Sequence, residues 1–438
     1  MNVWKTFALS EISDIRISNV DKKSAVNEAP VRLCNYMDVY SNDYLTADID
    51  YMEATATVAE REKFKVEQGD VLITKDSETP DDIGIPAVVV DEINDLVCGY
   101  HLALIKPKKS IVDPIFLAKQ LSSAQTASYF SKLAAGSTRY GLSNGAIEKT
   151  VVHAPSLASQ KRIGAILQTI DQAIEHTTTL IEKYQKIKAG LMHDLFTRGI
   201  GTDGQLRPPR EQAPELYQQA PIGWIPKEWE FGPIGGYLKS VQYGVSTSLD
   251  ERALGIPVLR MNNIQSNRFD VSDLKYSRDP EAYKVKLSAG DVLYNRTNSI
   301  EHVGKTAIWR DELVECSFAS YLVRLNLRTE ILLPEFFSHW MSQVSSQNAL
   351  RVYATPGVQQ VNINPTNLQR VVISLPCSRN EQSEISQRID AIDCRIEQEI
   401  AILNKLQKQK SGLMHDLLTG KVLVIANTVT KEAADVQN

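Results

Sequence analysis

The sequence contains two copies of one pattern, about 221 residues apart, and each copy ends in the same helical motif. Residues 190–195 read Gly-Leu-Met-His-Asp-Leu, and residues 412–417 repeat these six letters. Upstream, the string Gly-Asp-Val-Leu of residues 69–72 returns at residues 290–293. A repeat of this length is far longer than the roughly 20–45-residue units of solenoid proteins. The pattern therefore predicts two domains of one design, each followed by a long helix.

Bulk composition bounds the class of protein. With 438 residues, 43% of them hydrophobic, the chain can bury more than one core. The sequence has no run of eighteen apolar residues, so we expect no membrane span. The first residues lack the basic-then-apolar pattern of a secretory signal. A net charge of −5 argues against a protein that coats nucleic acid by charge alone. Five cysteines have no CxxC or zinc spacing, so we expect a cytoplasmic protein with reduced thiols and no metal site; they are Cys34, Cys98, Cys316, Cys377 and Cys394.

The two large segments before the helices have a mixed α/β pattern. Short β-rich runs are bounded by glycine, proline and aspartate, and a helical passage starts near a proline in each segment, at 114–133 and 334–353. In chain order the predicted pieces are a first domain at 1–155, a spacer helix at 156–200, a proline-rich linker at 201–221, a second domain at 222–376, a second spacer helix at 377–421 and a polar tail at 422–438.

Both spacer helices carry an apolar stripe whose spacing alternates between three and four residues, as a two-helix seam requires. Each stripe is interrupted by a polar residue at the same two steps, and Gly199 and Gly420 are placed to end the helices. Neither stripe can be buried by one helix alone, so we expect the two helices to pair. The predicted seam comprises Leu167, Ile170, Ile174, Thr177, Ile181, Tyr184, Lys188, Leu191 and Leu195, and then Ile389, Ile392, Ile396, Glu399, Leu403, Leu406, Lys410, Leu413 and Leu417.

The motifs of several enzyme classes are absent from the sequence. The Asn/Asp-Pro-Pro-aromatic string of DNA amino-methyltransferases, the dinucleotide-binding GxGxxG and the phosphate-binding GxxxxGK[ST] do not occur. His193-Asp194 and His415-Asp416 resemble acid–base pairs, but adjacent residues of a helix point to different sides. We therefore expect no catalytic residues in this chain and interpret the two histidine–aspartate motifs as surface or partner contacts.

In this order and twice over, these motifs resemble the specificity subunit of a Type I restriction–modification system. The strings that carry the resemblance are residues 287–297, Leu-Ser-Ala-Gly-Asp-Val-Leu-Tyr-Asn-Arg-Thr, then Val-Gly-Lys-Thr-Ala at 303–307, and the Lys-x-Gly-Leu-Met-His-Asp-Leu ends of both helices. Residues 222–229, Ile-Gly-Trp-Ile-Pro-Lys-Glu-Trp, are similar to that family's entry into its second recognition domain. The first domain departs from the pattern, because residues 74–86 replace the Arg-Thr…Val-Gly-Lys-Thr of the second.

The resemblance implies an α+β fold with two similar target-recognition domains, related by a pseudo-twofold internal repeat and separated by two long antiparallel coiled-coil helices. Each domain would read one half of a bipartite site in double-stranded DNA, while the helices set the spacing and dock two modification (methyltransferase) subunits. Restriction subunits would join in the full complex. The resemblance places S-adenosylmethionine, ATP and Mg on those partners, so no cofactor is expected in this chain.

Candidate DNA-reading residues lie in loops that are rich in the side chains that recognise base edges and poor in carboxylates. Arginine and lysine read guanine, and asparagine and glutamine read adenine, through paired hydrogen bonds. In the first domain the candidates are Lys75, Ser137, Thr138, Arg139, Tyr140 and Asn144. In the second domain they are Arg296, Thr297, Asn298, Lys305, Gln359, Gln360 and Asn362.

Two alternative functions remain open from the sequence. The chain could serve a methylation-only or Type II-like system, which nothing in this sequence separates from a Type I system. It could also be a coiled-coil adaptor that joins two protein-binding domains and does not bind DNA. Sequence-selective, salt-sensitive binding to duplex DNA would distinguish a specificity subunit from an adaptor.

Overall fold

A computed structural model describes residues 4–265, 267–357 and 360–424. The chain divides into two compact units, Met1–Thr179 with Ala401–Asn438, and Leu180–Ile400. Each unit therefore contains one domain, one half of the first long helix and one half of the second. The sequence predicts a helix after each domain; the structure divides both helices between the units. No helix in the described ranges combines the length and apolar character needed to cross a membrane.

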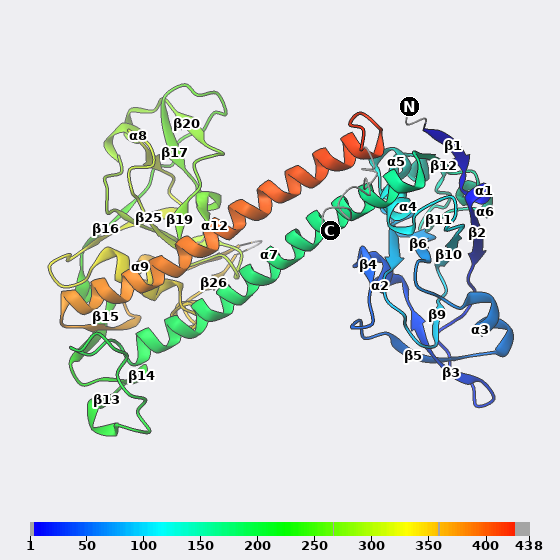
Figure 1. The fold of residues 1–438 in the computed structure, drawn as a ribbon. Helices are drawn as coiled ribbons and strands as arrows, with labels where there is room; N and C mark the ends of the chain where they lie inside the picture. Colours follow the sequence, from blue (N-terminus) through cyan, green and yellow to red (C-terminus); the bar gives the residue numbers. More distant parts are fainter. Residues whose placement is uncertain (1–3, 266, 358–359, 425–438) are drawn as a thin grey trace, which may run out of the picture. The chain divides into compact units, whose positions relative to one another are not determined.

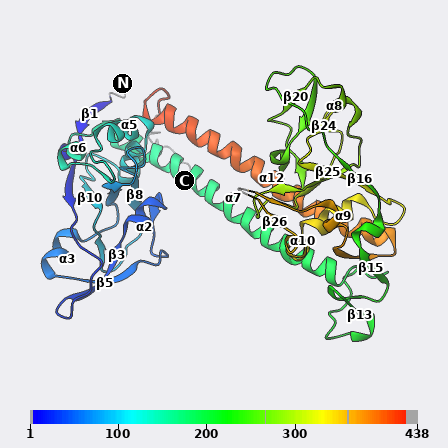
Figure 2. The ribbon, with the colours of Figure 1, turned by 180° about the vertical axis from the view of Figure 1, so that it is seen from behind.

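The first domain is built around a five-stranded sheet in the order β2-β10-β6-β8-β4. A three-stranded sheet, β5-β3-β9, lies at one end of the domain, and the pair β1-β12 lies at the other, as both views show (Figures 1 and 2). Its elements are β1 Lys5–Ala8, α1 Leu9–Ile12, β2 Ser13–Ile17, β3 Ala29–Cys34, α2 Tyr36–Tyr40, β4 Tyr44–Leu45, β5 Met52–Ala56, α3 Val58–Phe64, β6 Val71–Thr74, β7 Asp76–Ser77, β8 Pro86–Val89, β9 Leu96–Cys98, β10 Leu102–Pro107, α4 Pro114–Leu121, α5 Ala124–Leu133, β11 Tyr140–Gly141, α6 Asn144–Glu148, β12 Val151–Ala154 and α7 Leu157–Thr197.

The second domain repeats this plan, with the sheet β16-β25-β21-β23, the sheet β20-β17-β24 and the pair β15-β28. A short sheet, β22-β27-β26, corresponds to the β7-β11 pair of the first domain. The elements are η1 Pro214–Leu216, β13 Tyr217–Ala220, β14 Gly223–Pro226, β15 Trp229–Pro233, η2 Ile234–Tyr237, β16 Leu238–Tyr243, β17 Ile256–Leu259, η3 Met261–Asn263, β18 Ile264–Gln265, β19 Arg268–Phe269, β20 Lys275–Ser277, α8 Pro280–Lys284, β21 Val292–Asn295, β22 Thr297–Asn298, β23 Thr306–Ile308, β24 Ser317–Phe318, β25 Leu322–Leu327, α9 Pro334–Ser342, α10 Val344–Arg351, β26 Thr355–Pro356, β27 Val361–Asn362, α11 Pro365–Leu368, β28 Val372–Pro376 and α12 Arg379–Leu418.

The prediction of one continuous helical passage in each domain is wrong. The first passage divides into α4 and α5, because the Ser123 hydroxyl accepts a hydrogen bond from the Thr126 amide and starts a new helix. The second passage also divides, into α9 and α10 at Gln343, where no side chain caps the new helix. The break matters for function, since the turn between the two helices faces one end of a spacer helix.

A buried glutamine joins each domain to the start of its spacer helix. The side chain of Gln160 donates to the carbonyl groups of Pro155 and Ile111 and accepts from the backbone amide of Asp113. The side chain of Gln382 makes the corresponding three bonds in the second domain, to Pro376, Ile331 and Leu333. Both glutamines are almost fully buried, so all their polar atoms need partners. The two joints therefore fix each helix start against the N-terminus of α4 or α9.

Within each unit the two helix segments run antiparallel and are paired by a salt bridge. In the first unit Lys410 lies 2.7 Å from Asp171, and in the second Lys188 lies 2.5 Å from Asp393. The two lysines are the polar interruptions of the predicted seam, and the two aspartates are also repeat-related. Each lysine therefore faces the aspartate of the other helix. Every predicted seam residue is buried or half-buried, as the accessibility of both helices shows.

The salt bridge of the first unit belongs to a larger network in which Asp171 and Lys119 are buried. Asp171 also contacts Lys119, at 2.7 Å, and accepts a hydrogen bond from the Tyr44 hydroxyl. Asp43 lies near both lysines, 2.7 Å from Lys119 and 3.2 Å from Lys410. Burial opposes ionisation of Asp43, but the two ammonium groups outweigh it and lower the pKa of this carboxyl. The network ties the spacer helices to the sheet of the first domain.

The linker at 201–221 packs against the start of α12 rather than only connecting two domains. Its Arg207 is 8% exposed and donates to Glu381 at 2.6 Å. Glu381 also accepts hydrogen bonds from the Ile200 amide and the Trp229 indole. Ser378 caps the Glu381 amide at 3.5 Å, but the glutamate side chain turns to the linker and does not complete a capping box.

Replacing Glu381 with alanine should destabilise the second unit by about 3 kcal/mol or more. The change leaves the buried Arg207 guanidinium with Glu228 alone, at 2.6 Å and 69% exposed, and loss of one partner of a buried ion pair typically costs about 3–5 kcal/mol. Urea unfolding monitored by far-UV circular dichroism measures the effect. As a matched control, Glu397→Ala removes an ion pair with Arg268 in which both side chains are 45% exposed, and should change stability by less than about 1 kcal/mol. Equal effects of the two substitutions would contradict the role assigned to Glu381.

Candidate nucleic-acid interface

In both domains the central strand of the main sheet ends in a loop of the same construction. After β6, the Lys75 amide donates to the His101 carbonyl, and its own carbonyl accepts from the Leu142 amide. After β21, Arg296 makes the same two backbone bonds, with Tyr321 and Ile363. The chain is thus held between two other segments at equivalent positions, whatever side chains the loop carries.

The loop closes at a buried glycine in each domain. The Gly84 amide donates to the Thr74 carbonyl, and the Gly304 amide donates to the Asn295 carbonyl. Both glycines have positive φ, +77° and +89°, and a Cβ on Gly84 would meet the ring of Phe130 at 2.2 Å. The first-domain segment that departs from the family pattern in sequence therefore has the backbone construction of its counterpart in the second domain.

The structure brings together the two candidate loops that the sequence indicates in each domain. In the first domain β7 pairs with β11, which places the residues after Lys75 beside Tyr140. In the second, β22 pairs with β27, which sets Thr297 opposite Asn362 and Asn298 opposite Val361. These pairs join segments far apart in the sequence, so the loops form one continuous surface on each domain.

The individual candidates differ in exposure and partners. In the first domain Ser137, Thr138 and Arg139 are exposed, Lys75 and Tyr140 are half-buried, and Asn144 is exposed at the start of α6. In the second, the Arg296 guanidinium lies 5.3 Å from the ring centre of Tyr243. The Thr297 hydroxyl accepts from the Asn362 amide at 2.9 Å. Asn298, Lys305 and Gln360 are half-buried in the same loops, and Gln359 lies outside the described residues.

His101 is a residue of this surface that the sequence reasoning missed. Its Nδ1 lies 2.5 Å from the Asp76 carboxylate, and its Nε2 lies 3.2 Å from the Arg139 guanidinium. A guanidinium only donates and a carboxylate only accepts, so this geometry fits a neutral ring with its proton on Nδ1. Aligning residues 98–102 with 318–322 would have shown that His101 corresponds to Tyr321 of the second domain.

The two surfaces differ in charge. The first-domain loop, residues 75–83, contains four acidic residues and one lysine. The equivalent loop of the second domain, residues 296–303, contains one acidic residue beside an arginine and a histidine. The criterion of loops poor in carboxylates therefore fits the second domain and does not fit the first. The same backbone construction thus presents an acidic loop in the first domain and a loop with balanced charges in the second.

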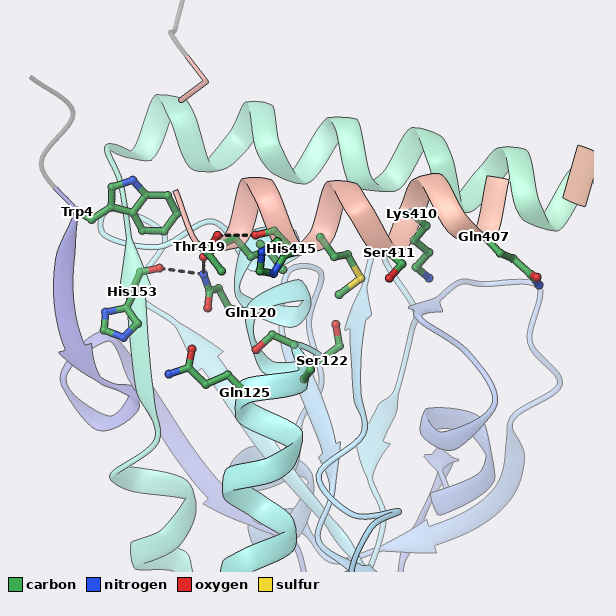
Figure 3. A pocket seen from close by; sticks show the side chains of 14 residues that line it. Trp4, Gln120, Ser122, Gln125, His153, Gln407, Lys410, Ser411, His415 and Thr419 are labelled. Carbon is green, nitrogen blue, oxygen red and sulfur yellow. Dashed lines mark hydrogen bonds between the residues drawn. The ribbon is translucent and has the colours of Figure 1, made fainter. Parts of the chain in front are cut away.

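A second pair of equivalent sites lies at the repeated helix ends. In the first unit a pocket of about 1010 Å³ lies between the C-terminal part of α12 and the turn that joins α4 to α5. Figure 3 shows Gln407, Lys410, Ser411 and His415 of α12 on the side of the pocket opposite Ser122 and Gln125. The second unit has a pocket of about 670 Å³ between the end of α7 and the turn that joins α9 to α10.

The helix residues of the two pockets are repeat-related. Gln185, Lys188, Met192 and His193 in the second unit correspond to Gln407, Lys410, Met414 and His415 in the first. The aspartates that follow the histidines form ion pairs along their own chain, Asp194 with Arg198 and Asp416 with Lys421. Neither aspartate is bonded to its neighbouring histidine within the described residues. Among those residues, no group of three or more His, Cys, Asp or Glu side chains is placed to hold a metal ion.

Comparison with known proteins identifies the family to which the two repeated domains belong. The model of the Type I restriction modification DNA specificity domain matches the chain twice, over residues 1–185 and 226–408. The chain belongs to this family. The two matches together cover both domains and most of both long helices.

Relatives share this assignment at low identity. The MjaX type I restriction enzyme specificity subunit of Methanocaldococcus jannaschii is 28% identical over 47% of this chain and 49% of its own length. The EcoKI specificity subunit of Escherichia coli K12 is 24% identical over 70% of this chain and 66% of its own length. The chain therefore spans between half and two thirds of the length of these two relatives. A crystal structure of the S subunit of a Type-I restriction-modification system from M. genitalium has a TM-score of 0.59 at 12% identity, covering 95% of this chain and 96% of that one, which shows a shared fold.

Proposed function

We propose that this chain is the DNA-binding specificity subunit of a Type I restriction–modification complex. Each domain would read one half of a bipartite site through its paired loops. The observation that carries the proposal is the twofold occurrence of one backbone construction, around Lys75 and around Arg296, with unlike side chains. A reader of two different half-sites needs this combination, because the scaffold must be constant while the groups that face the bases must vary.

The two equivalent pockets support two copies of one partner. Four of their helix residues are identical in kind, a glutamine, a lysine, a methionine and a histidine, and each pocket lies beside an exposed histidine, His193 or His415. In the proposed complex a methyltransferase subunit docks at each pocket and supplies S-adenosylmethionine chemistry. Restriction subunits supply ATP- and Mg-dependent cleavage. This chain then contributes recognition and assembly and no catalytic group.

Single substitutions in the pockets should remove the methyltransferase subunits one at a time. His193→Glu places a carboxylate at one pocket, and we expect it to lower the number of bound subunits from two to one. His415→Glu should do the same at the other pocket, and the double variant should bind none. Native mass spectrometry of the purified complex counts the copies. Lys183→Glu, on an exposed part of α7 outside the pocket, is the matched control and should keep both. A double variant that still binds two subunits would exclude these pockets as docking sites.

Binding to duplex DNA tests the proposed function itself. The complex with methyltransferase subunits should bind one bipartite sequence selectively, with affinity that falls as salt rises. The chain alone should bind weakly, because its net charge of −5 limits phosphate neutralisation. An adaptor that joins proteins would show no selective binding in either form.

A further inference from the structure

A large cleft on the first domain is lined by side chains that are not among the candidate DNA-reading residues. It has a volume of about 1060 Å³ and lies beside Arg139 and Thr138, two of the candidate DNA-reading residues. One wall is formed by the tyrosines of α2, Tyr36 and Tyr40, whose rings stack with centroids 5.6 Å apart. The acidic loop after β6 also lines the cleft, with Asp76, Glu78 and Asp82. The cleft therefore continues the recognition surface of this domain.

The four carboxylates of the acidic loop differ in their hydrogen-bond partners and in their exposure. Asp76 is paired with His101 at 2.5 Å, and Asp81, which does not line the cleft, accepts from the Ser131 hydroxyl at 2.7 Å. Glu78 is exposed on a flexible side chain at the rim. Asp82 is half-buried in the cleft. Of the three carboxylates of this loop that line the cleft, Asp82 is the one that is half-buried and not paired with a basic side chain.

Asp82 is oriented by a single hydrogen bond. The Tyr40 hydroxyl donates to its Oδ2 at 2.8 Å, and this bond raises the pKa of Tyr40 because it holds the phenol proton. Among the described residues no other side chain donates to this carboxylate. Its Oδ1 therefore remains an acceptor at the surface of the cleft, and its direction is set by a tyrosine that is itself stacked on Tyr36.

A carboxylate on a DNA-reading surface has a restricted choice of ligand. It repels phosphate and cannot bond the N7 or O6 acceptors of guanine. It can accept a hydrogen bond from an exocyclic amino group in the major groove, the N4 amino group of cytosine or the N6 amino group of adenine. An acid-rich loop is therefore unfavourable for DNA binding in general but favourable at a position where such an amino group is presented.

We propose that Asp82 is a specificity-determining residue of the first domain and reads the amino group of one cytosine or adenine in its half-site. The proposal rests on the proposed function and adds the base chemistry to it. Tyr40 then acts as a positioning residue, because it touches Asp82 and orients its free oxygen. Arg139, held by His101, lies on the same cleft and is available for the partner base or the backbone.

Base analogues test the proposal with the unaltered protein. In the recognised duplex, each cytosine or adenine of the first half-site is replaced in turn by an analogue without the amino group, pyrimidin-2-one or purine. At one position the wild-type complex should lose about tenfold or more in affinity. With Asp82→Ala that replacement should cost nothing further. The replacement loss should persist in Asp81→Asn, the matched control with the same change of charge.

Methylation mapping in cells gives an independent readout. Asp82→Asn should relax or change the base read at one position of the first half-site, since an amide can pair with adenine through both its groups. Tyr40→Phe should weaken discrimination at the same position. The second half-site should remain unchanged and serves as the control for folding. Amino-group dependence that persists in Asp82→Ala, or its absence throughout the first half-site, would overturn the proposal. Failure of the wild-type complex to select any duplex would instead refute the proposed function.

Discussion

Exchanging residues 222–376 for the corresponding domain of a relative should change one half of the recognised DNA site and leave the other half unchanged. The reason is that the second domain has its own sheets, its own core and its own paired loops around Arg296. The first domain keeps its own loops around Lys75, since none of their residues is exchanged. Genome-wide mapping of methylated adenines in cells that express the hybrid measures the outcome.

The structure adds a condition to this exchange. The incoming domain must pack against the retained end of α7, where Phe196 meets the ring of Phe336 with centroids 5.2 Å apart. Trp229 contacts the same ring from β15. A donor domain should therefore be chosen with aromatic residues at both positions. The reciprocal exchange of residues 1–155 is the matched control and should change the other half-site. A change in both halves after either exchange would show that the domains are not independent readers.

Lengthening both spacer helices by the same amount should lengthen the gap between the two half-sites. Four residues added between Thr179 and Leu180, and four between Ile400 and Ala401, extend each helix by about 6 Å at roughly 1.5 Å per residue. Duplex DNA rises about 3.4 Å per base pair, so the preferred spacer should grow by one or two base pairs. Both half-site sequences should stay the same, since no reading loop changes. Methylation of substrates with graded spacers measures the preference.

These insertion points follow from the division of the chain into units. They lie at the boundaries between the units, so the Asp171–Lys410 pair of one unit and the Lys188–Asp393 pair of the other both remain intact. Adding four residues to α7 alone is the matched control. One helix would then lose its register with the other, and we expect activity to fall at every spacer length. An unchanged spacer preference in an active, doubly lengthened complex would show that the helices do not set the distance.

The sequence was most informative where a pattern repeats locally. The three–four spacing of apolar residues depends only on the period of an α-helix, so it marks the helix faces that are buried, from Leu167 to Leu195 and from Ile389 to Leu417. The repeat of Gly-Asp-Val-Leu likewise marks equivalent strands, β6 and β21, because equal strings 221 residues apart adopt equal positions in two copies of a fold.

Contacts between segments far apart in the sequence could be identified only from the tertiary structure. The repeated residues Asp171 and Lys188 were visible in the sequence, but the partner of each lies on the other helix, Lys410 and Asp393. The spacing of residues within one helix does not show which charged side chain of the other helix a given residue faces. The role proposed for Asp82 likewise could not be inferred from the sequence, since it depends on a hydrogen bond from Tyr40, which lies 42 residues earlier in the chain.

By itself, the sequence determined that this protein consists of two α/β copies, each followed by a long amphipathic helix, because both facts follow from internal repetition and helical period. Only the tertiary structure decided that each helix is shared between the two units, so that the motif ending at Leu195 packs with the second domain and the one ending at Leu417 with the first. The physical reason is that an apolar helix end is buried by whichever surface the antiparallel pairing brings to it, and chain order does not specify that surface.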